Sequence, residues 1–399
     1  MNGMLKELEN DNTAKIKRRV NTAFILAFVL LILFPVFLIN HDKNSISVAE
    51  QRVLVNFPPG SEVVTKGFSQ FRTDFTSGLQ DRVGLRNVFV GVAGATKLYT
   101  LRQSPNDIAR IGKDGWYFYT GDHNIEIGTG AYKFTDEWLS MIDENQQVMS
   151  NYFQKKGAVY FFMPSPAKPS IYPEYLPGDY QVQNTVIDQV TDSLQNNTEV
   201  NVIAVKDYLV KNKGLGRLYL KQDFHWDTLG SYLAYEQIIQ EMNKVGVLDN
   251  AKPISMNIQG KNYGRGEVSN YFGGILPNEY APDVVWDAHA TEITSGEEYE
   301  QLKSLCEKGF LEGHRLLDRN FTVYKNPSAE GGTLLIYGDS QMVNERKIPA
   351  YLAEHFKLVV NVGGTPNIYE ALDDAVKPDV VVFQRSERYL SLLFTVPGA

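Results

Sequence analysis

Residues 333–340 read TLLIYGDS, and this stretch decides the fold class. Its first five residues form an apolar run typical of a strand buried on both faces, and a glycine turn follows them. Two similar runs follow at residues 358–362 and 380–383, with a segment of helical character before each. Strands that alternate with helices predict parallel pairing, and therefore an α/β fold.

The same alternation extends towards the N-terminus. Strands are expected at residues 158–162 and 201–205, and helices at 134–155, 186–195, 228–244, from 341 to about 356, and 368–375. Residues 246–330 break this rhythm, because Gly, Asn and Pro are mixed there with a charged helical piece at 297–308. We interpret residues 111–399 as one domain with an insertion at about 246–330.

An apolar segment precedes this domain. Residues 22–39 carry no charge, and their length matches the roughly 17 to 25 residues that span a bilayer. Lys15, Lys17, Arg18 and Arg19 come just before it and favour a cytoplasmic N-terminus. The expected layout is a cytoplasmic tail at residues 1–20, a transmembrane anchor at 21–40, an extracytoplasmic helical connector at 41–110, and then the domain.

A cleaved signal peptide is the alternative for this segment. A cleavage site needs small residues soon after the apolar core, whereas Asn-His-Asp-Lys follows at residues 40–43. We therefore expect a single-pass protein of the cell membrane, with the domain outside the cytoplasm.

Composition narrows the range of partners. The formal net charge is −8, and the cations next to the apolar segment leave the remainder more acidic still, which argues against nucleic acid. Cys306 is the only cysteine, so no intrachain disulfide can form, and we assign this thiol no role.

Ser340 is the first candidate for chemistry. It follows a buried strand and a glycine turn, and ligands in open α/β sheets bind at the carboxyl ends of strands. Backbone N–H groups at the start of the next helix can stabilise an oxyanion there. The alternative is that Asp339 or Ser340 only caps that helix.

Asp223 and His225 form the second candidate. Because they are two residues apart, both side chains can lie on one side of an extended backbone, so the carboxylate can hold the imidazole. The imidazole would then serve as general base for a serine hydroxyl, which is a weak nucleophile alone. Together the two candidates predict a Ser-His-Asp triad for acyl transfer or ester cleavage.

Two other interpretations of this segment remain open. Asp227 can cap a helix that begins after it. Alternatively, Asp223, His225 and Asp227 could hold a metal, although a metal site needs more ligands than this segment offers. We predict no metal and no cofactor.

At this point the sequence resembles the alginate O-acetyltransferase family of SGNH-hydrolase-like proteins, of the AlgJ and AlgX type, with the related DHHW proteins. The Asp-x-His-Trp and Gly-Asp-Ser pair is the specific part. The matching motifs are Ala49–Leu54 with Phe57 and Pro58, Asp81 and Arg82, Leu85–Asn87, Gly112–Trp116, Pro166–Lys168, Tyr172–Glu174, Asp223–Trp226, Gly338–Ser340, and Glu387 with Arg388.

The resemblance implies a fold and a set of roles. It implies an SGNH-hydrolase-like parallel sheet with flanking helices, in which Ser340 is the nucleophile, His225 the general base and then acid, and Asp223 the orienting group. It further implies O-acetyl transfer to an exported or cell-wall polysaccharide. A separate membrane-bound O-acyltransferase would supply the acetyl group.

One departure concerns the oxyanion. Ordinary SGNH enzymes place an asparagine after a late strand, whereas Gln384 follows Phe383 here. The backbone N–H groups of Ser340 and of Gly363 or Gly364 are the expected oxyanion donors instead. Lys168 and Arg388 are candidate contacts to substrate, and each could equally be a structural ion-pair partner.

Two rival functions use the same residues. A polysaccharide acetylesterase would have an identical triad. A non-catalytic partner that tethers a membrane acyltransferase complex through its anchor would leave Ser340 dispensable.

Overall fold

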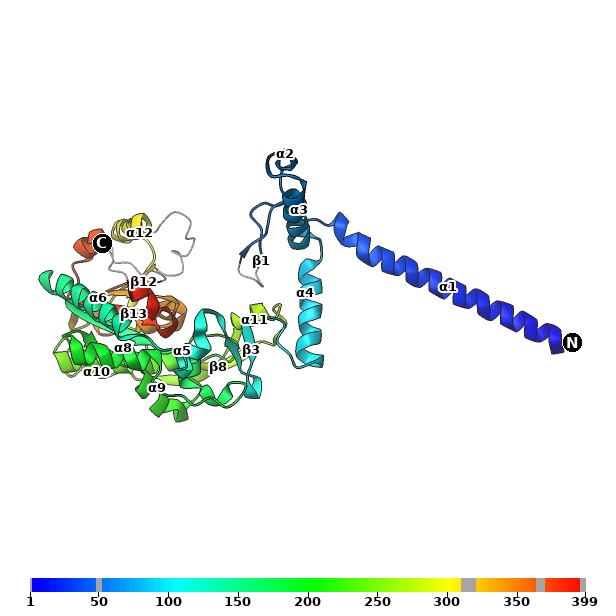
Figure 1. The fold of residues 1–399 in the computed structure, drawn as a ribbon. Coiled ribbons are helices and arrows are strands. Elements are labelled where there is room, and N and C mark those ends of the chain that lie inside the picture. Colours follow the sequence, from blue (N-terminus) through cyan, green and yellow to red (C-terminus); the bar gives the residue numbers. More distant parts are fainter. Residues whose placement is uncertain (1, 48–51, 310–320, 364–369, 395–399) are drawn as a thin grey trace. The chain divides into compact units, whose positions relative to one another are not determined.

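The computed structural model describes residues 2–47, 52–309, 321–363 and 370–394. These residues form two compact units (Figure 1). Unit 1 takes its residues from 1–105 and 270–275, and unit 2 from 106–269 and 276–399. The predicted residue boundaries of tail, anchor, connector and domain stay predictions.

Unit 1 is largely helical. Its elements are α1 (Asn2–Phe37), β1 (Ile46–Ser47), β2 (Arg52–Val53), α2 (Glu62–Lys66), α3 (Phe68–Arg82), α4 (Arg86–Ala95) and a π-helical turn, Thr96–Thr100. Within α1, Ile16–Phe37 is long and apolar enough to cross a membrane. This finding fits the predicted single-pass anchor, and it fits a signal sequence as well.

Arg82 organises the middle of unit 1. Its guanidinium is buried and donates hydrogen bonds to the carbonyl oxygens of Asn40, Asp42 and Val55, at 3.1, 2.6 and 2.7 Å. A planar group with five donors can satisfy several backbone oxygens at once. Arg82 thereby ties the segment that follows α1 to the end of α3.

Unit 2 is built on a central sheet. The described residues form seven strands in the order β6 (Asn201–Val202), β5 (Val159–Ser165), β13 (Val380–Ser386), β11 (Gly331–Gly338), β12 (Phe356–Gly363), β10 (Phe321–Lys325) and β9 (Thr291–Ile293). Neighbouring strands from β6 to β12 are parallel, whereas β10 is antiparallel to both of its neighbours. The predicted α/β class and the SGNH-like fold are confirmed.

The strands that the sequence indicated pair in parallel, and the sheet becomes mixed only at the edge formed by β10 and β9. Only residues 326–330 separate β10 from β11, and so short a connection cannot return the chain for a parallel strand. The edge strands β9 and β10 lie in the region that the sequence indicated to be irregular. Their short runs carried too little alternating pattern to be recognised.

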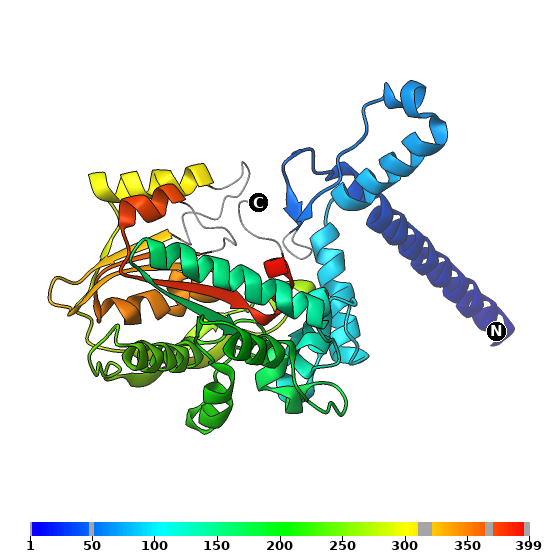
Figure 2. The same ribbon diagram turned by 60° about the vertical axis from the view of Figure 1, so that its left-hand side comes forward.

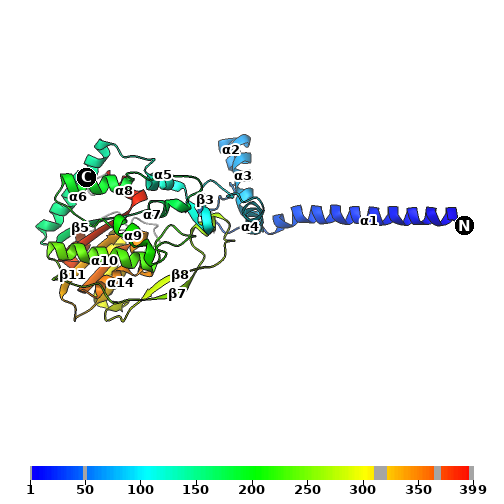
Figure 3. The same ribbon diagram turned by 90° about the horizontal axis from the view of Figure 1, so that it is seen from below.

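Helices cover both faces of the sheet, as alternating side chains require. Leu334 and Ile336 of β11 pack on the side of α9 (Lys206–Asn212), α10 (Thr228–Val245) and α14 (Ile348–Ala353). Leu335 and Tyr337 pack on the side of α6 (Asp136–Lys155), α8 (Val186–Asn197), α12 (Glu297–Gly309) and α15 (Glu370–Val376). Figure 2 shows α6 along one face, and Figure 3 shows α10 and α14 together over the strands.

The predicted helices at 134–155, 186–195, 228–244 and 297–308 are confirmed, with small differences at their ends. The helix expected after Ser340 is shorter. Two 3₁₀ turns (Ser340–Met342 and Asn344–Arg346) come first, and α14 begins only after Lys347, whose φ of 66° interrupts a right-handed helix. The start of the helix predicted at 368–375 lies outside the described residues.

Residues 246–330 contain more structure than the sequence indicated. Strand β7 (Asn257–Gly264) pairs antiparallel with β8 (Glu279–Val285), and α11 (Val268–Tyr271) lies between them in the chain. Nearer the N-terminus, β3 (Ala109–Ile111) pairs with β4 (Tyr117–Tyr119), and the Gly112–Trp116 motif forms most of the connection between them. The remaining short helices of unit 2 include α5 (Asn124–Thr129) and α7 (Lys168–Ile171).

Candidate active site

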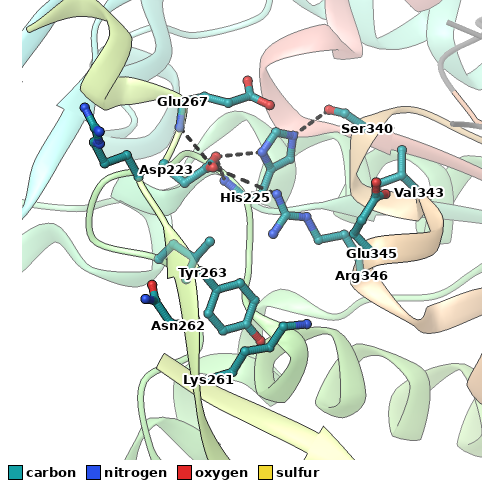
Figure 4. A pocket seen from close by; sticks show the side chains of 13 residues that line it. Asp223, His225, Lys261, Asn262, Tyr263, Glu267, Ser340, Val343, Glu345 and Arg346 are labelled. Carbon is teal, nitrogen blue, oxygen red and sulfur yellow. Dashed lines mark hydrogen bonds and ion pairs between the residues drawn. The ribbon is translucent and has the colours of Figure 1, made fainter. Parts of the chain in front are cut away.

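The structure brings Asp223, His225 and Ser340 together (Figure 4). His225 Nε2 lies 2.7 Å from Ser340 Oγ, and His225 Nδ1 lies 2.7 Å from Asp223 Oδ1. The imidazole and the carboxylate are both buried. This chain of two hydrogen bonds has the geometry by which a carboxylate orients an imidazole towards a hydroxyl.

The loop that carries His225 is held at both ends. Tyr219 and Trp226 form a β-bridge, and the indole of Trp226 donates to the carbonyl of Gln341 at 3.2 Å. Asp227 caps α10, because its Oδ1 accepts the N–H groups of Leu229 and Gly230 at 3.0 Å each. Burial raises the pKa of Asp227 to about 7. The helix-cap interpretation of Asp227 is therefore confirmed.

Ser340 stands at the end of β11 on a turn fixed by Asp339. One oxygen of this carboxylate accepts the N–H of Gln341 at 2.9 Å, and the other accepts the N–H of Ser386 at 2.6 Å. The side-chain oxygen of Gln384 accepts the Asp339 N–H at 2.9 Å. In the part of the chain that the structure describes, the Ser340 N–H has no acceptor.

Asp223 sits where a negative charge is stabilised. Burial alone would raise its pKa, but His225 and Arg346 outweigh this effect and hold the pKa well below its ordinary range. The carboxylate also accepts the backbone N–H groups of Phe224 at 2.7 Å and Glu267 at 3.2 Å. It therefore remains ionised and keeps His225 in one orientation.

Glu267 is a neighbour that the sequence analysis missed. Its carboxylate, Asp223 and His225 bring one ligand-type atom each within 4.8 Å of one another. Burial and the charge of Asp223 raise the pKa of Glu267. Both ring nitrogens of His225 already have partners in Asp223 and Ser340, so a metal here would have to break the triad.

A cleft of about 460 Å³ opens onto the triad. Its walls come from the end of β7 and the segment after it, and from the turns that follow Ser340. The lining residues outside the triad include Lys261, Asn262, Tyr263, Arg265, Glu267, Val343, Glu345 and Arg346. A cleft lined mainly by polar side chains suits a hydroxyl-rich ligand better than an apolar one.

Comparison with known proteins identifies the domain. Residues 109–306 match a family model described as an SGNH hydrolase-like domain of the acetyltransferase AlgX. This part of the chain is an AlgX-type SGNH hydrolase-like domain. The resemblance expected from the motifs is thus confirmed, and at the family level the domain is an SGNH-like acetyltransferase domain. No curated protein sequence matches the chain.

Several solved structures resemble this chain. The O-acetyltransferase domain of Pseudomonas putida AlgJ is 16% identical, with a TM-score of 0.47, and covers 71% of this chain and 92% of that one. PatB1 of Bacillus cereus is 15% identical, with a TM-score of 0.48, and covers 73% and 100%. A DHHW family protein of Eubacterium siraeum is 15% identical, with a TM-score of 0.48, and covers 70% and 91%.

Lys168 is not among the residues that line the cleft of this AlgX-type domain. The side chain is only 1% exposed, and its Nζ donates to the carbonyl oxygens of Tyr117 at 2.5 Å, Leu220 at 3.2 Å, Lys221 at 3.0 Å and Asp223 at 2.5 Å. Burial lowers the pKa of Lys168 to about 7, and Asp223 opposes this shift. These contacts fit the structural role that the sequence analysis left open, and the contact with substrate stays a prediction. Through these hydrogen bonds, Lys168 holds the loop that carries Asp223 in place, which we call its pinning role.

Arg388 lies beside the nucleophile. Its guanidinium stacks 4.2 Å from the ring centre of Phe224, and it lines a second, smaller cavity that also includes Ser340. The prediction of a contact between Arg388 and substrate is compatible with this position and stays a prediction. The sequence near Arg388 contains no pattern that predicts its contact with Phe224, which is distant in the chain.

Of the two glycines expected to donate to the oxyanion, the structure describes only Gly363. Gly363 ends β12 and pairs in register with Gly338, two residues before Ser340. Gly364 lies outside the described residues. Gln384 cannot replace the asparagine of ordinary SGNH enzymes in this structure, because its two side-chain atoms bind the Asp339 N–H and Ser165 Oγ, at 2.9 and 2.6 Å.

We predict that Lys168→Met impairs catalysis and folding together. The three N–H donors that Lys168 shares among four carbonyl groups would be lost, which should cost about 3 kcal/mol or more and lower Tm by roughly 6–12 °C. A displaced Asp223 loop should reduce kcat for an activated acetyl ester by about 100-fold, with little change in KM. Thermal unfolding and steady-state kinetics measure both.

Lys244→Met is the matched control, because the Lys244 side chain is 65% exposed. This variant should keep both Tm and kcat. An increase in KM alone for Lys168→Met, with kcat and Tm unchanged, would contradict the pinning role and favour contact with substrate.

Asp223 should also make stability depend on pH. Its pKa is lower in the folded chain than the ordinary value of 3.8. The ionised carboxylate therefore stabilises the fold above that value, and the contribution is lost as the pH falls through the folded pKa. We expect the difference in unfolding free energy between wild type and Asp223→Asn to be largest at pH 5 and above, and to shrink at lower pH. Urea unfolding at a series of pH values measures it, and a difference that does not vary with pH would contradict the prediction.

Proposed function

We propose that this chain is a membrane-anchored, extracytoplasmic O-acyltransferase that moves an acetyl group through Ser340 to a hydroxyl of an exported or cell-wall polysaccharide. The observation that carries the proposal is the 2.7 Å contact between Ser340 Oγ and His225 Nε2, with Asp223 on the far side of the imidazole. The membership in an AlgX-type family of acetyltransferases supports the same reaction class.

The first half-reaction places the acyl group on the enzyme. His225 Nε2 takes the Ser340 proton as Oγ attacks the acyl carbonyl, and a tetrahedral oxyanion forms. When the bond to the donor's leaving group breaks, His225 returns the proton to that group. Asp223 stabilises the imidazolium throughout.

The second half-reaction repeats these steps with the acceptor. His225 takes the proton of an acceptor hydroxyl, whose oxygen attacks the acyl ester on Ser340. A second tetrahedral species collapses, the new ester leaves, and the proton returns to Ser340 Oγ. Ser340 is thereby restored.

Two groups support the proposed oxyanion site. The Ser340 N–H is a donor without an acceptor among the described residues, and Gly363 stands at the neighbouring strand end. Preorganised backbone donors of this kind stabilise charge that develops in the transition state. The positive charge of Arg388 near Ser340 adds to that field.

The apolar segment supports the proposed location of the chain, and the family supports its proposed partners. With α1 in the bilayer and its basic flank in the cytoplasm, unit 2 would meet the polymer outside. The donor would be a separate membrane-bound O-acyltransferase that passes the acetyl group across the membrane.

The first test is Ser340→Ala in the full chain, solubilised in detergent. Removal of the nucleophile should lower the rate of 4-nitrophenyl acetate cleavage by about 10³-fold or more. Ser69→Ala, on the exposed surface of α3, should leave the rate unchanged. Equal rates for wild type and Ser340→Ala would exclude the acyl-enzyme.

The second test separates transfer from hydrolysis. Oligosaccharides are added to the same assay, and the products are analysed by mass spectrometry. Acetylated sugar supports a transferase, whereas acetate alone, at all acceptor concentrations, identifies an esterase. In cells, Ser340→Ala should abolish acetylation of the polymer, and unchanged acetylation would leave only the non-catalytic tethering role.

A further inference from the structure

Ser340 lines two cavities of very different size. One is the cleft of about 460 Å³, and the other is a cavity of about 10 Å³. Among the described residues, Ser340 is the one that lines both. The other residues that line the smaller cavity are Asn124, Pro166, Ala167, Phe224, Gln341, Ser386 and Arg388.

The chemistry of the triad decides which part of the substrate enters each cavity. The donor's leaving group and the acceptor hydroxyl must both exchange a proton with His225. Among the described residues, His225 lines the larger cleft and not the smaller cavity. Both groups must therefore use the cleft. The alkyl part of the acyl group exchanges no proton, so it can occupy the smaller cavity.

The volume of the smaller cavity limits that alkyl part. About 10 Å³ is the space that one water molecule requires. A methyl group is of similar size, so the acyl group that fits is acetyl. Each further methylene would have to displace packed atoms, and such overpacking disfavours a longer acyl chain.

Contacts with neighbouring side chains hold two of the residues that line this cavity, Phe224 and Ala167. Phe224 lies 4.2 Å from the Arg388 guanidinium on one side, and its ring centre is 5.7 Å from that of Tyr119. The N–H of Ala167 donates to the buried carboxylate of Glu387 at 2.9 Å, and that carboxylate also accepts the N–H of Ile187 at 3.0 Å. Two walls are thus held by contacts from different parts of the chain.

We propose that this smaller cavity is the acyl pocket, and that Phe224 and Ala167 restrict the donor to acetyl. The proposal rests on the acyl-enzyme of the proposed function and adds the residues that set the length of the acyl chain. It identifies Phe224 as a specificity residue of the Asp-Phe-His-Trp segment, between the two triad members.

The test compares 4-nitrophenyl acetate, propionate and butyrate as donors for the full chain in detergent. For wild type, kcat/KM with butyrate should be at least about 100-fold below that with acetate, since two methylenes must be excluded. Phe224→Ala should raise the butyrate-to-acetate ratio of kcat/KM by about 10-fold or more. Ala167→Gly, a smaller change at a different wall, should raise the propionate-to-acetate ratio.

The control is Phe68→Ala, because Phe68 is 70% exposed in unit 1 and lies outside both cavities. This variant should keep the wild-type ratios. The ratio within one variant is insensitive to the fraction of folded enzyme, so a partly unfolded Phe224→Ala still reports on selectivity.

The outcomes separate this proposal from the proposed function. If Ser340-dependent cleavage of butyrate equals that of acetate in wild type, or if neither enlarging variant changes its ratio, the smaller cavity is not the acyl pocket and the acyl-enzyme stands. If no ester is cleaved in a Ser340-dependent manner, the proposed function is wrong. The acyl-pocket proposal is then wrong as well, because it depends on the acyl-enzyme.

Discussion

The hydrogen bond between His225 Nε2 and Ser340 Oγ joins two segments that lie 115 residues apart in the chain. A bond of this kind is short and directional, so both ends must be fixed before it can form reliably. The fold meets this requirement twice. Asp227 fixes the histidine loop to the start of α10, and Asp339 fixes the serine turn to the end of β13.

Buried charges provide much of this fixation. Loops expose backbone carbonyl and N–H groups that have no partners in a helix or sheet, and each one left unsatisfied in the interior costs free energy. Lys168 satisfies four carbonyl groups around the histidine loop, while Glu387 satisfies the N–H groups of Ala167 and Ile187. Each charge is offset by several hydrogen bonds, which makes its removal more costly than that of a surface charge.

The sequence sufficed for the parts of the structure that have a local pattern. The apolar run of β11 with its glycine turn predicted both a central strand and an exposed Ser340, and the two-residue spacing predicted that Asp223 could hold His225. No such pattern marks the cleft wall formed after β7, where Glu267 becomes a neighbour of Asp223 only through the fold. Nor does a local pattern mark the surroundings of Lys168, because its carbonyl partners come from segments about 50 residues away in the chain.

An acyl group on Ser340 would face a choice between a sugar hydroxyl and water. The cleft is open, and Lys261, Glu345 and Arg346 on its walls attract water, so the fold alone does not keep the site dry. Selectivity for transfer must then come from the acceptor, which displaces that water when it binds along the polar walls. The smaller cavity that Ser340 also lines would have the opposite property, since a volume of about 10 Å³ occupied by the proposed methyl group would leave no room for a water molecule. Water could then approach the acyl carbon only through the cleft, which is the path that the proposed polysaccharide acceptor would occupy.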